Sequence, residues 1–166
     1  MHDESDRLLA CIPRLRRYAR ALTGEPAGAD DLVQDTMERG WLKLASWRPG
    51  GDMRAWLFGI MHNLHVDRVR RPGLATVPLG EEMDPPAPAA TDTLVLRDLD
   101  AALRLLPAEQ RAVLLLVALE EMTYEEVAAA LAIPLGTVMS RLSRGRERLR
   151  LTMLGQAVAA PLKVVK

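Results

Sequence analysis

Apolar residues recur three and four positions apart along most of this chain, which is the period of an amphipathic helix. The pattern predicts helices over residues 7–22, from 28 to 45 and from 53 to 71, and it resumes between 107 and 150. Aromatic residues make up only 4% of the chain, β-branched runs are scarce, and Ala, Leu, Arg and Glu dominate. Because these abundant residues favour helix, both the pattern and the composition predict an all-α fold.

The helical pattern stops in the middle of the chain. Residues 72–92, PGLATVPLGEEMDPPAPAATD, contain five prolines and show neither a helical nor a strand period. Proline lacks a backbone donor and stiffens a chain into extended segments. We therefore predict two small helical domains, 1–71 and 94–150, joined by a Pro-rich linker at 72–93 and followed by a C-terminal tail at 151–166. Each domain is too small to bury a large core alone.

The helical wheels of the N-terminal domain separate a core face from an outer face. Four residues of the second helix share one apolar stripe: Val33, Met37, Gly40 and Leu44. In the third helix, Trp56, Leu57, Ile60, Met61 and Leu64 form the apolar face. The outer face of the second helix is charged, yet it carries Leu42. A lone leucine among charges indicates either a partner surface or, more simply, a solvated face with one stray apolar residue.

The C-terminal domain carries a helix-turn-helix pattern. Thr123 and Glu126 have the spacing of a capping box, which marks the start of a short helix from Tyr124 to Leu131. A break at 132–134 is followed by a longer helix that begins at Leu135. Two helices joined by so tight a turn, the second of them basic, predict a helix-turn-helix.

Charge is concentrated on that second helix although the whole chain is neutral. The chain has 22 basic and 22 acidic residues, yet residues 141–150 hold five arginines and a single acid, Glu147. One stripe of the helix is apolar (Val138, Leu142, Gly145 and Leu149), which leaves Thr137, Ser140, Arg141, Arg144 and Arg148 on the outer faces. Such a surface fits a DNA major groove. Arginines that only aid solubility are the alternative, but few ion-pair partners lie at helical spacing, so we expect DNA contact.

Several other classes of protein are disfavoured by the sequence. Cys11 is the only cysteine, so neither an intramolecular disulfide framework nor a cysteine-based zinc site can form. No run approaches the roughly 18 apolar residues of a membrane span, and the N-terminus is acidic where a signal peptide would be basic. His62 and His65 lie three apart without a nearby third ligand. We expect a cytoplasmic protein without membrane insertion, metal or cofactor, and not an enzyme.

Three motifs in order carry a family resemblance that covers about residues 7–150. DDLVQDTMERGWLKL (30–44), RAWLFGIMHNLHVDRVRR (54–71) and the segment from LPAEQRAVLLL to the arginine-rich helix (106–150) are similar to domains two and four of bacterial sigma factors. The chain resembles the extracytoplasmic-function (ECF, group IV) alternative sigma factors of the sigma-70 family. The resemblance implies a sigma domain 2 helical bundle and a sigma domain 4 helix-turn-helix that direct core RNA polymerase to specific promoters and assist promoter opening.

The resemblance also implies roles for individual residues. The residues that would face core polymerase are Asp31, Gln34, Asp35, Glu38, Arg39 and Leu42. Those that would contact the minus-10 element are Trp47, Arg54, Asn63 and Arg70, with Trp47 stacking on a flipped base while Trp56 packs in the core. Those that would read the minus-35 element are Thr137, Ser140, Arg141, Arg144 and Arg148. The partners implied are core RNA polymerase, promoter DNA and an anti-sigma factor, and the free protein would be a monomer.

The chain departs from the family pattern at three positions. Gly59 replaces a larger, often basic residue, His62 stands where arginine is common, and Met139 stands where lysine is frequent. DNA contacts through these three positions are therefore not expected. The tail, 151–166, has no counterpart in the shared motifs.

Two other classes of function share part of the pattern. A plain helix-turn-helix repressor or response-regulator output domain explains residues 107–150 but leaves the N-terminal domain without a role. A sigma-mimicking regulator, which binds an anti-sigma factor instead of DNA, would contain the same helices. The five arginines of residues 141–150 argue against the mimic.

Overall fold

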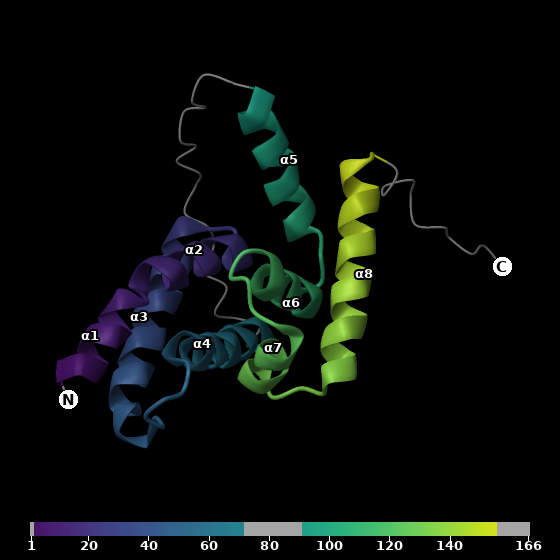
Figure 1. Cartoon of the computed structure of the whole chain (residues 1–166). Coiled ribbons are helices and arrows are strands. Elements are labelled where there is room, and N and C mark those ends of the chain that lie inside the picture. The colour runs from purple at the N-terminus through teal and green to yellow at the C-terminus, as the bar shows by residue number, and fades with distance from the viewer. Residues whose placement is uncertain (1, 72–90, 156–166) are drawn as a thin grey trace.

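The computed structural model describes residues 2–71 and 91–155, and within these ranges the regular structure consists of eight α-helices and one short 3-10 helix. Figure 1 shows the first four α-helices gathered in one bundle and the last four in another. The prediction of an all-α fold is confirmed. None of the described helices combines the length and the apolar character needed to cross a membrane.

The N-terminal bundle is formed by α1 (His2–Ala10), α2 (Ile12–Thr23), α3 (Pro26–Leu42), η1 (Leu44–Ser46) and α4 (Met53–Arg70). Helix α3 packs against both α2 and α4. Tyr18 of α2 and Phe58 of α4 meet edge to face at the centre, with ring centroids 5.0 Å apart, and both are fully buried. The predicted core residues Leu57 and Met61 lie beside them, also fully buried.

Two boundaries in this bundle differ from the sequence prediction. Residues 7–22 do not form one helix, because the chain breaks at Cys11 and restarts with Pro13 in the first turn of α2. Helix α3 begins at Pro26, before the predicted start at 28. In both places proline occupies the first turn of a helix, where its missing N–H has no intrahelical partner to lose.

The C-terminal bundle contains α5 (Thr91–Arg104), α6 (Ala108–Ala118), α7 (Tyr124–Leu131) and α8 (Leu135–Met153). The predicted helix-turn-helix is confirmed as α7 and α8. Its capping box is present, since Glu126 N donates to Thr123 Oγ1 at 3.1 Å and Thr123 N donates to Glu126 Oε1 at 3.2 Å.

The edges of the predicted linker and tail are helical. Helix α5 begins at Thr91, inside the predicted linker, and α8 continues to Met153, inside the predicted tail. The rest of the linker, 72–90, and of the tail, 156–166, lies outside the described residues.

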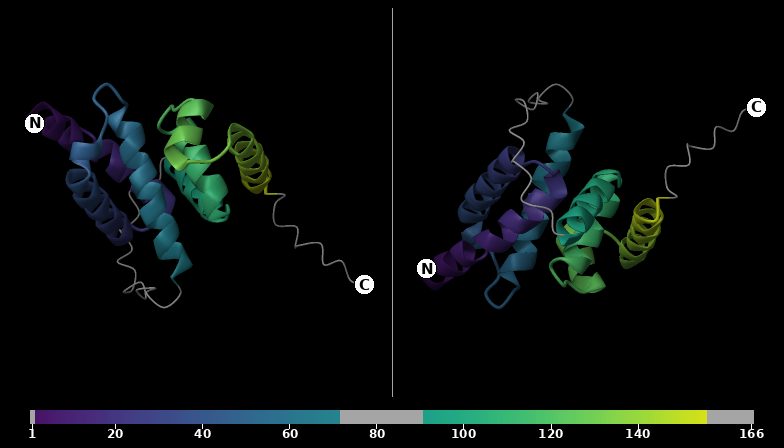
Figure 2. Two further views of the ribbon diagram at one scale, coloured as in Figure 1. Left: turned by 90° about the horizontal axis from the view of Figure 1, so that it is seen from below. Right: turned by 90° about the horizontal axis from the view of Figure 1, so that it is seen from above.

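The two bundles pack against each other through what we call the domain interface, in which α2 contacts α6 and α4 contacts α7. The views from below and above in Figure 2 both show the bundles side by side. Buried residues of both bundles belong to one continuous apolar cluster that includes Leu57 of α4 and Val127 of α7. Each small domain thus completes its core against the other.

Helices α4 and α7 approach each other closely at Gly59 of α4. A Cβ atom placed on Gly59 would lie 2.5 Å from the main-chain oxygen of Ala130 in α7. A backbone atom cannot move aside as a flexible side chain can, so only glycine lets α7 lie this close to α4. The residue that departs from the family pattern is therefore a packing residue here.

Arginines from both bundles donate across the domain interface. Arg17 of α2 donates to Leu119 O at 3.3 Å and Glu120 Oε1 at 3.1 Å, and Arg54 of α4 donates to Glu120 O at 3.1 Å. In the opposite direction, Arg111 donates to Leu22 O at 2.8 Å and Arg104 donates to Gly24 O at 2.7 Å. These bonds join the α6–α7 turn to the N-terminal bundle and the end of α2 to the C-terminal bundle.

Candidate nucleic-acid and polymerase interfaces

Helix α8 is anchored by one apolar stripe and presents the rest of its surface outward. Val138 and Leu142 are 0% and 2% exposed, and Leu149 is half-buried. A Cβ atom on Gly145 would lie 3.5 Å from Gln110 Cβ, so α6 packs closely at that position. The buried stripe predicted from the sequence is confirmed, which leaves the arginine-rich faces of α8 open.

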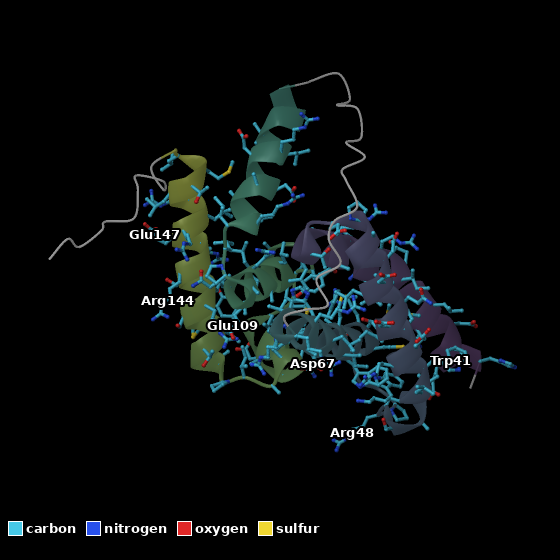
Figure 3. All side chains as sticks on the ribbon, turned by 180° about the vertical axis from the view of Figure 1, so that it is seen from behind. Trp41, Arg48, Asp67, Glu109, Arg144 and Glu147 are labelled. Atoms are coloured by element: carbon cyan, nitrogen blue, oxygen red, sulfur yellow. The ribbon has the colours of Figure 1, made fainter. Side chains whose placement is uncertain are left out.

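Most of the residues predicted to read the minus-35 element lie on these open faces. Ser140, Arg144 and Arg148 are exposed, and Thr137 is half-buried in the first turn. Figure 3 shows Arg144 and Glu147 pointing outward from α8. The Glu147 carboxylate forms an ion pair with the Arg150 guanidinium at 2.8 Å, so it does not neutralise Arg144 or Arg148.

Arg141 is directed differently from the other predicted minus-35 residues. Its side chain is only 23% exposed and its guanidinium lies 3.5 Å from the Glu109 carboxylate of α6. Burial lowers the pKa of the neighbouring His62, and the positive charge of Arg141 lowers it further while Glu109 raises it. Arg141 thus lies against α6 rather than on the open face of α8.

The tryptophan predicted to stack on a flipped base is buried in this structure. Trp47 is 7% exposed and belongs to the apolar cluster, whereas Trp56, expected in the core, is only half-buried. The loop after η1 folds back over the indole, since a Cβ atom on Gly51 would lie 3.6 Å from Trp47 Nε1. Trp47 is therefore a core residue rather than an exposed stacking residue, while Trp56 packs against the same core as a half-buried residue. Arg48 projects from the loop (Figure 3).

The other predicted minus-10 residues lie on α4. The Arg54 side chain is 22% exposed and lies 3.5 Å from the Asp52 carboxylate and 3.9 Å from the Glu126 carboxylate of α7. Asn63 is exposed on a groove between α4 and α7 that Trp56 and Ala129 also line. Arg70 is exposed in the last turn of α4.

The predicted polymerase-binding residues share one face of α3. Asp31, Gln34, Glu38, Arg39 and Leu42 are exposed, and Leu42 is 82% exposed. Asp35 is half-buried and forms an ion pair with Arg68 of α4.

Sequence reasoning missed one residue of this surface. Trp41 is 54% exposed next to Leu42 and points away from the bundle in Figure 3. An exposed indole beside an exposed leucine is an apolar patch, and the signal was available as the tripeptide Gly-Trp-Leu at the end of the helix.

Polar groups are also buried near the domain interface. Glu120 is 1% exposed and Tyr18 is fully buried, and burial raises the pKa of the Tyr18 hydroxyl, with a further contribution from the charge of Glu120. The Tyr18 hydroxyl and Glu120 Oε2 have no hydrogen-bond partner among the described protein atoms. The described residues hold no group of three or more His, Cys, Asp or Glu side chains that could bind a metal ion.

Comparisons with protein families match both bundles separately. Residues 8–62 match the family model described as the Sigma2 domain of PhyR, and residues 96–149 match the model described as Sigma-70, region 4. The first matched segment lies within the N-terminal bundle, and the second lies within the C-terminal bundle and contains α7 and most of α8.

Two curated relatives extend the similarity over most of the chain. The ECF RNA polymerase sigma factor EcfG of Rhodopseudomonas palustris is 36% identical over 151 residues, which covers 87% of this chain and 81% of that protein. The ECF RNA polymerase sigma factor SigE of Mycolicibacterium smegmatis is 39% identical over 145 residues, 82% of this chain and 56% of that protein.

Solved structures share the arrangement of helices. The sigma factor RpoE in complex with the anti-sigma factor NepR from Bartonella quintana has a TM-score of 0.76 and 34% identity, covering 93% of this chain and 98% of that one. CnrH in complex with the cytosolic domain of CnrY has a TM-score of 0.63 and 29% identity, covering 85% and 80%. The anti-anti-sigma factor PhyR, also with NepR, has a TM-score of 0.61 at 18% identity, which shows the fold alone.

Proposed function

We propose that separate helices of this chain, which belongs to the ECF family of RNA polymerase sigma factors, bind separate partners. Helix α8 reads the minus-35 element, α3 binds core polymerase, and α4 contacts the minus-10 element. The family membership makes the chain a transcription initiation factor that directs RNA polymerase to promoters, not an enzyme.

The arginine-rich open face of α8 is the observation that carries the minus-35 assignment. A recognition helix in the major groove uses its early residues for base edges and its later basic residues for phosphates. Ser140 and Arg144 occupy the first group and Arg148 the second, and all three are exposed. Arg144 is suited to a bidentate contact with guanine.

The end of α3 supports the polymerase assignment. The stripe from Asp31 to Leu42 is charged for most of its length and ends in the apolar patch of Trp41 and Leu42. We assign this face to core polymerase in the bound state and to an anti-sigma factor in the silent state, because RpoE and CnrH were solved with NepR and CnrY. On this proposal the chain acts in the cytoplasm in complex with core polymerase and is a monomer when it is free.

One comparison favours a second candidate function. The N-terminal bundle matches the Sigma2 domain of PhyR, and PhyR is an anti-anti-sigma factor. A sigma mimic would bind an anti-sigma factor through the same helices without contacting DNA. The open arginines of α8 favour the sigma factor, since a mimic has no phosphates to neutralise.

Run-off transcription with purified core polymerase separates these candidates. The template carries the promoter region upstream of the protein's own gene, and the anti-sigma partner is left out. We expect transcripts that depend on the chain. A sigma mimic gives none, and a plain repressor binds the same DNA without polymerase.

Replacing Arg144 with alanine tests the assignment of α8. Arg144→Ala should weaken use of the minus-35 element by about 1–3 kcal/mol, roughly 5-fold to 150-fold, while leaving core binding intact. Arg146→Ala is the matched control, because Arg146 is an exposed arginine of α8 outside the predicted reading face. Promoter titration and a core-binding assay measure the two effects, and equal loss of both would contradict the division of labour.

A further inference from the structure

Arg141 of α8 is held against α6, away from the open face of its own helix. Its side chain is 23% exposed, and its guanidinium lies 3.5 Å from the Glu109 carboxylate. We propose that Arg141 is a positioning residue, which orients α8 for reading the minus-35 element through this ion pair and does not itself contact a base. The inference rests on the proposed function of α8.

Apolar packing alone leaves the rotation of α8 about its axis loosely fixed. Val138 and Leu142 are buried, and a Cβ atom on Gly145 would lie 3.5 Å from Gln110 Cβ of α6. These contacts determine how close α8 lies to α6. They are non-directional, because the hydrophobic effect depends on the buried area and not on the alignment of particular atoms. An ion pair joins one point on each helix, so it can fix the rotation that apolar packing leaves open.

The position of Arg141 on α8 suits such a tether. Successive residues lie roughly 100° apart around a helix axis, which places Arg141 between the buried stripe and the face that carries Ser140 and Arg144. Both of these reading side chains are exposed on the same helix, so a rotation of α8 displaces them together. A recognition site has to hold its polar groups to within about 0.5 Å. A small rotation of α8 therefore weakens every contact on the reading face at once.

Glu109 is a fixed anchor because α6 is itself tied to two other helices. Glu109 lies in the first turn of α6. Two residues later, Arg111 donates to Leu103 O of α5 and to Leu22 O of α2, both at 2.8 Å. The ion pair therefore aligns α8 against an element that both bundles hold in place.

The exposure of the pair sets the size of the expected effect. The Glu109 side chain is 62% exposed, and a pair this accessible to solvent changes an equilibrium by no more than about fivefold. Its loss therefore leaves the chain folded. It lowers the fraction of molecules in which α8 has the reading orientation, and the apparent affinity for the minus-35 element falls with that fraction.

Glu109→Gln tests the pair without changing the recognition helix. We expect the complex of this variant with core polymerase to bind a promoter duplex containing the minus-35 element up to about fivefold more weakly than the wild type does. Removal of a negative charge would by itself strengthen binding, because it reduces repulsion of the phosphates, so the direction of the change is diagnostic. Glu125→Gln is the matched control, since Glu125 is likewise an exposed acid in the first turn of its helix, α7.

Exchange of the two charges tests whether Arg141 acts through Glu109. Arg141→Glu should weaken minus-35 binding, and the addition of Glu109→Arg should restore most of it, because the pair is rebuilt with its signs reversed. An arginine that contacted DNA directly would not be rescued, since the exchange leaves a carboxylate at its position. Base-pair substitutions across the element give a second readout, because a misoriented helix loses discrimination at several base pairs and a lost base contact loses it at one.

The outcomes distinguish this inference from the proposed function. Weaker binding by Glu109→Gln but not by Glu125→Gln, with rescue by the charge exchange and unchanged urea midpoints, supports a positioning role. Unchanged or tighter binding by Glu109→Gln overturns it, as does an exchange that restores nothing. If Arg144→Ala weakens minus-35 binding and Glu109→Gln does not, only this inference fails. If Arg144→Ala also leaves minus-35 binding unchanged, the proposed function of α8 fails.

Discussion

The indole of Trp47 is enclosed beneath its own loop with only 7% of the residue exposed. We predict that Trp47→Ala lowers the free energy of unfolding by about 3–5 kcal/mol, as large aromatic truncations in cores do. Trp56→Ala is the matched control, because Trp56 is half-buried and should cost less. Urea denaturation measures both, and an equal or smaller loss at Trp47 would contradict its place in the core.

His65 makes the stability of the chain depend on pH. Its pKa is lowered from 6.5 to about 4, mainly because the imidazole is buried and further because the positive charges of His62, Arg111 and Arg68 disfavour its protonated form. The folded chain therefore favours the neutral imidazole, and between these pH values the unfolded chain binds more protons. The contribution of neutral His65 to the free energy of unfolding is fully present above pH 6.5 and is lost as the pH decreases towards 4.

The contribution of His65 can be isolated by substitution. We predict a loss on the order of 2 kcal/mol between pH 6.5 and 4 for the wild type, and a smaller loss for His65→Gln, whose amide does not titrate. Urea midpoints of both proteins across this pH range measure the effect. Carboxylates titrate equally in both proteins, so their contribution cancels in the comparison. Parallel pH profiles would show that His65 is not responsible.

At the scale of elements, Arg111 ties two helix ends together. Its guanidinium donates to Leu103 O, Arg104 O and Leu106 O at the end of α5, and to Leu22 O at the end of α2, at 2.8–2.9 Å. We predict that Arg111→Lys lowers the free energy of unfolding by about 2 kcal/mol, because an ammonium group cannot reproduce the planar fork of donors. Urea denaturation measures the loss, with Arg97→Lys, an exposed arginine of α5, as control.

Periodicity predicted the strongest elements well and the irregular ones less well. Helices α4, α7 and α8 have continuous apolar stripes, and α4 and α7 also begin with side-chain caps at Asp52 and Thr123. All three begin within a few residues of their predicted starts. The break at Cys11 was missed because the apolar period continues across it. Helix α5 was not predicted, because it begins at Thr91, within the segment that was assigned to the linker.

The exposure of a candidate-site residue could be predicted only where it depends on contacts within a single helix. The outward face of α8 follows from one helix alone, so the positions of Arg144 and Arg148 could be read from spacing. The burial of Trp47 depends on a loop that folds back, and the orientation of Arg141 depends on Glu109 in another helix. The role of Gly59 required knowing that α7 packs on α4, which no pattern within either helix reveals.

For the whole molecule, the shared apolar cluster predicts cooperative unfolding. Buried residues of both bundles belong to one cluster, so neither bundle keeps its full core without the other. We predict one calorimetric transition on heating, with the calorimetric enthalpy equal to the van't Hoff enthalpy. Two resolved transitions would mean that the bundles unfold independently.

The acceptors of the interdomain hydrogen bonds are mostly main-chain oxygens. Leu22, Gly24, Leu119 and Glu120 all accept through their backbone carbonyls, and Glu120 alone also accepts through its side chain. Every residue type carries such an oxygen, so the accepting positions can drift through mutation while the arginines opposite them keep their partners. Substitutions at these accepting positions can therefore leave the packing of the two bundles unchanged as long as the backbone keeps its path.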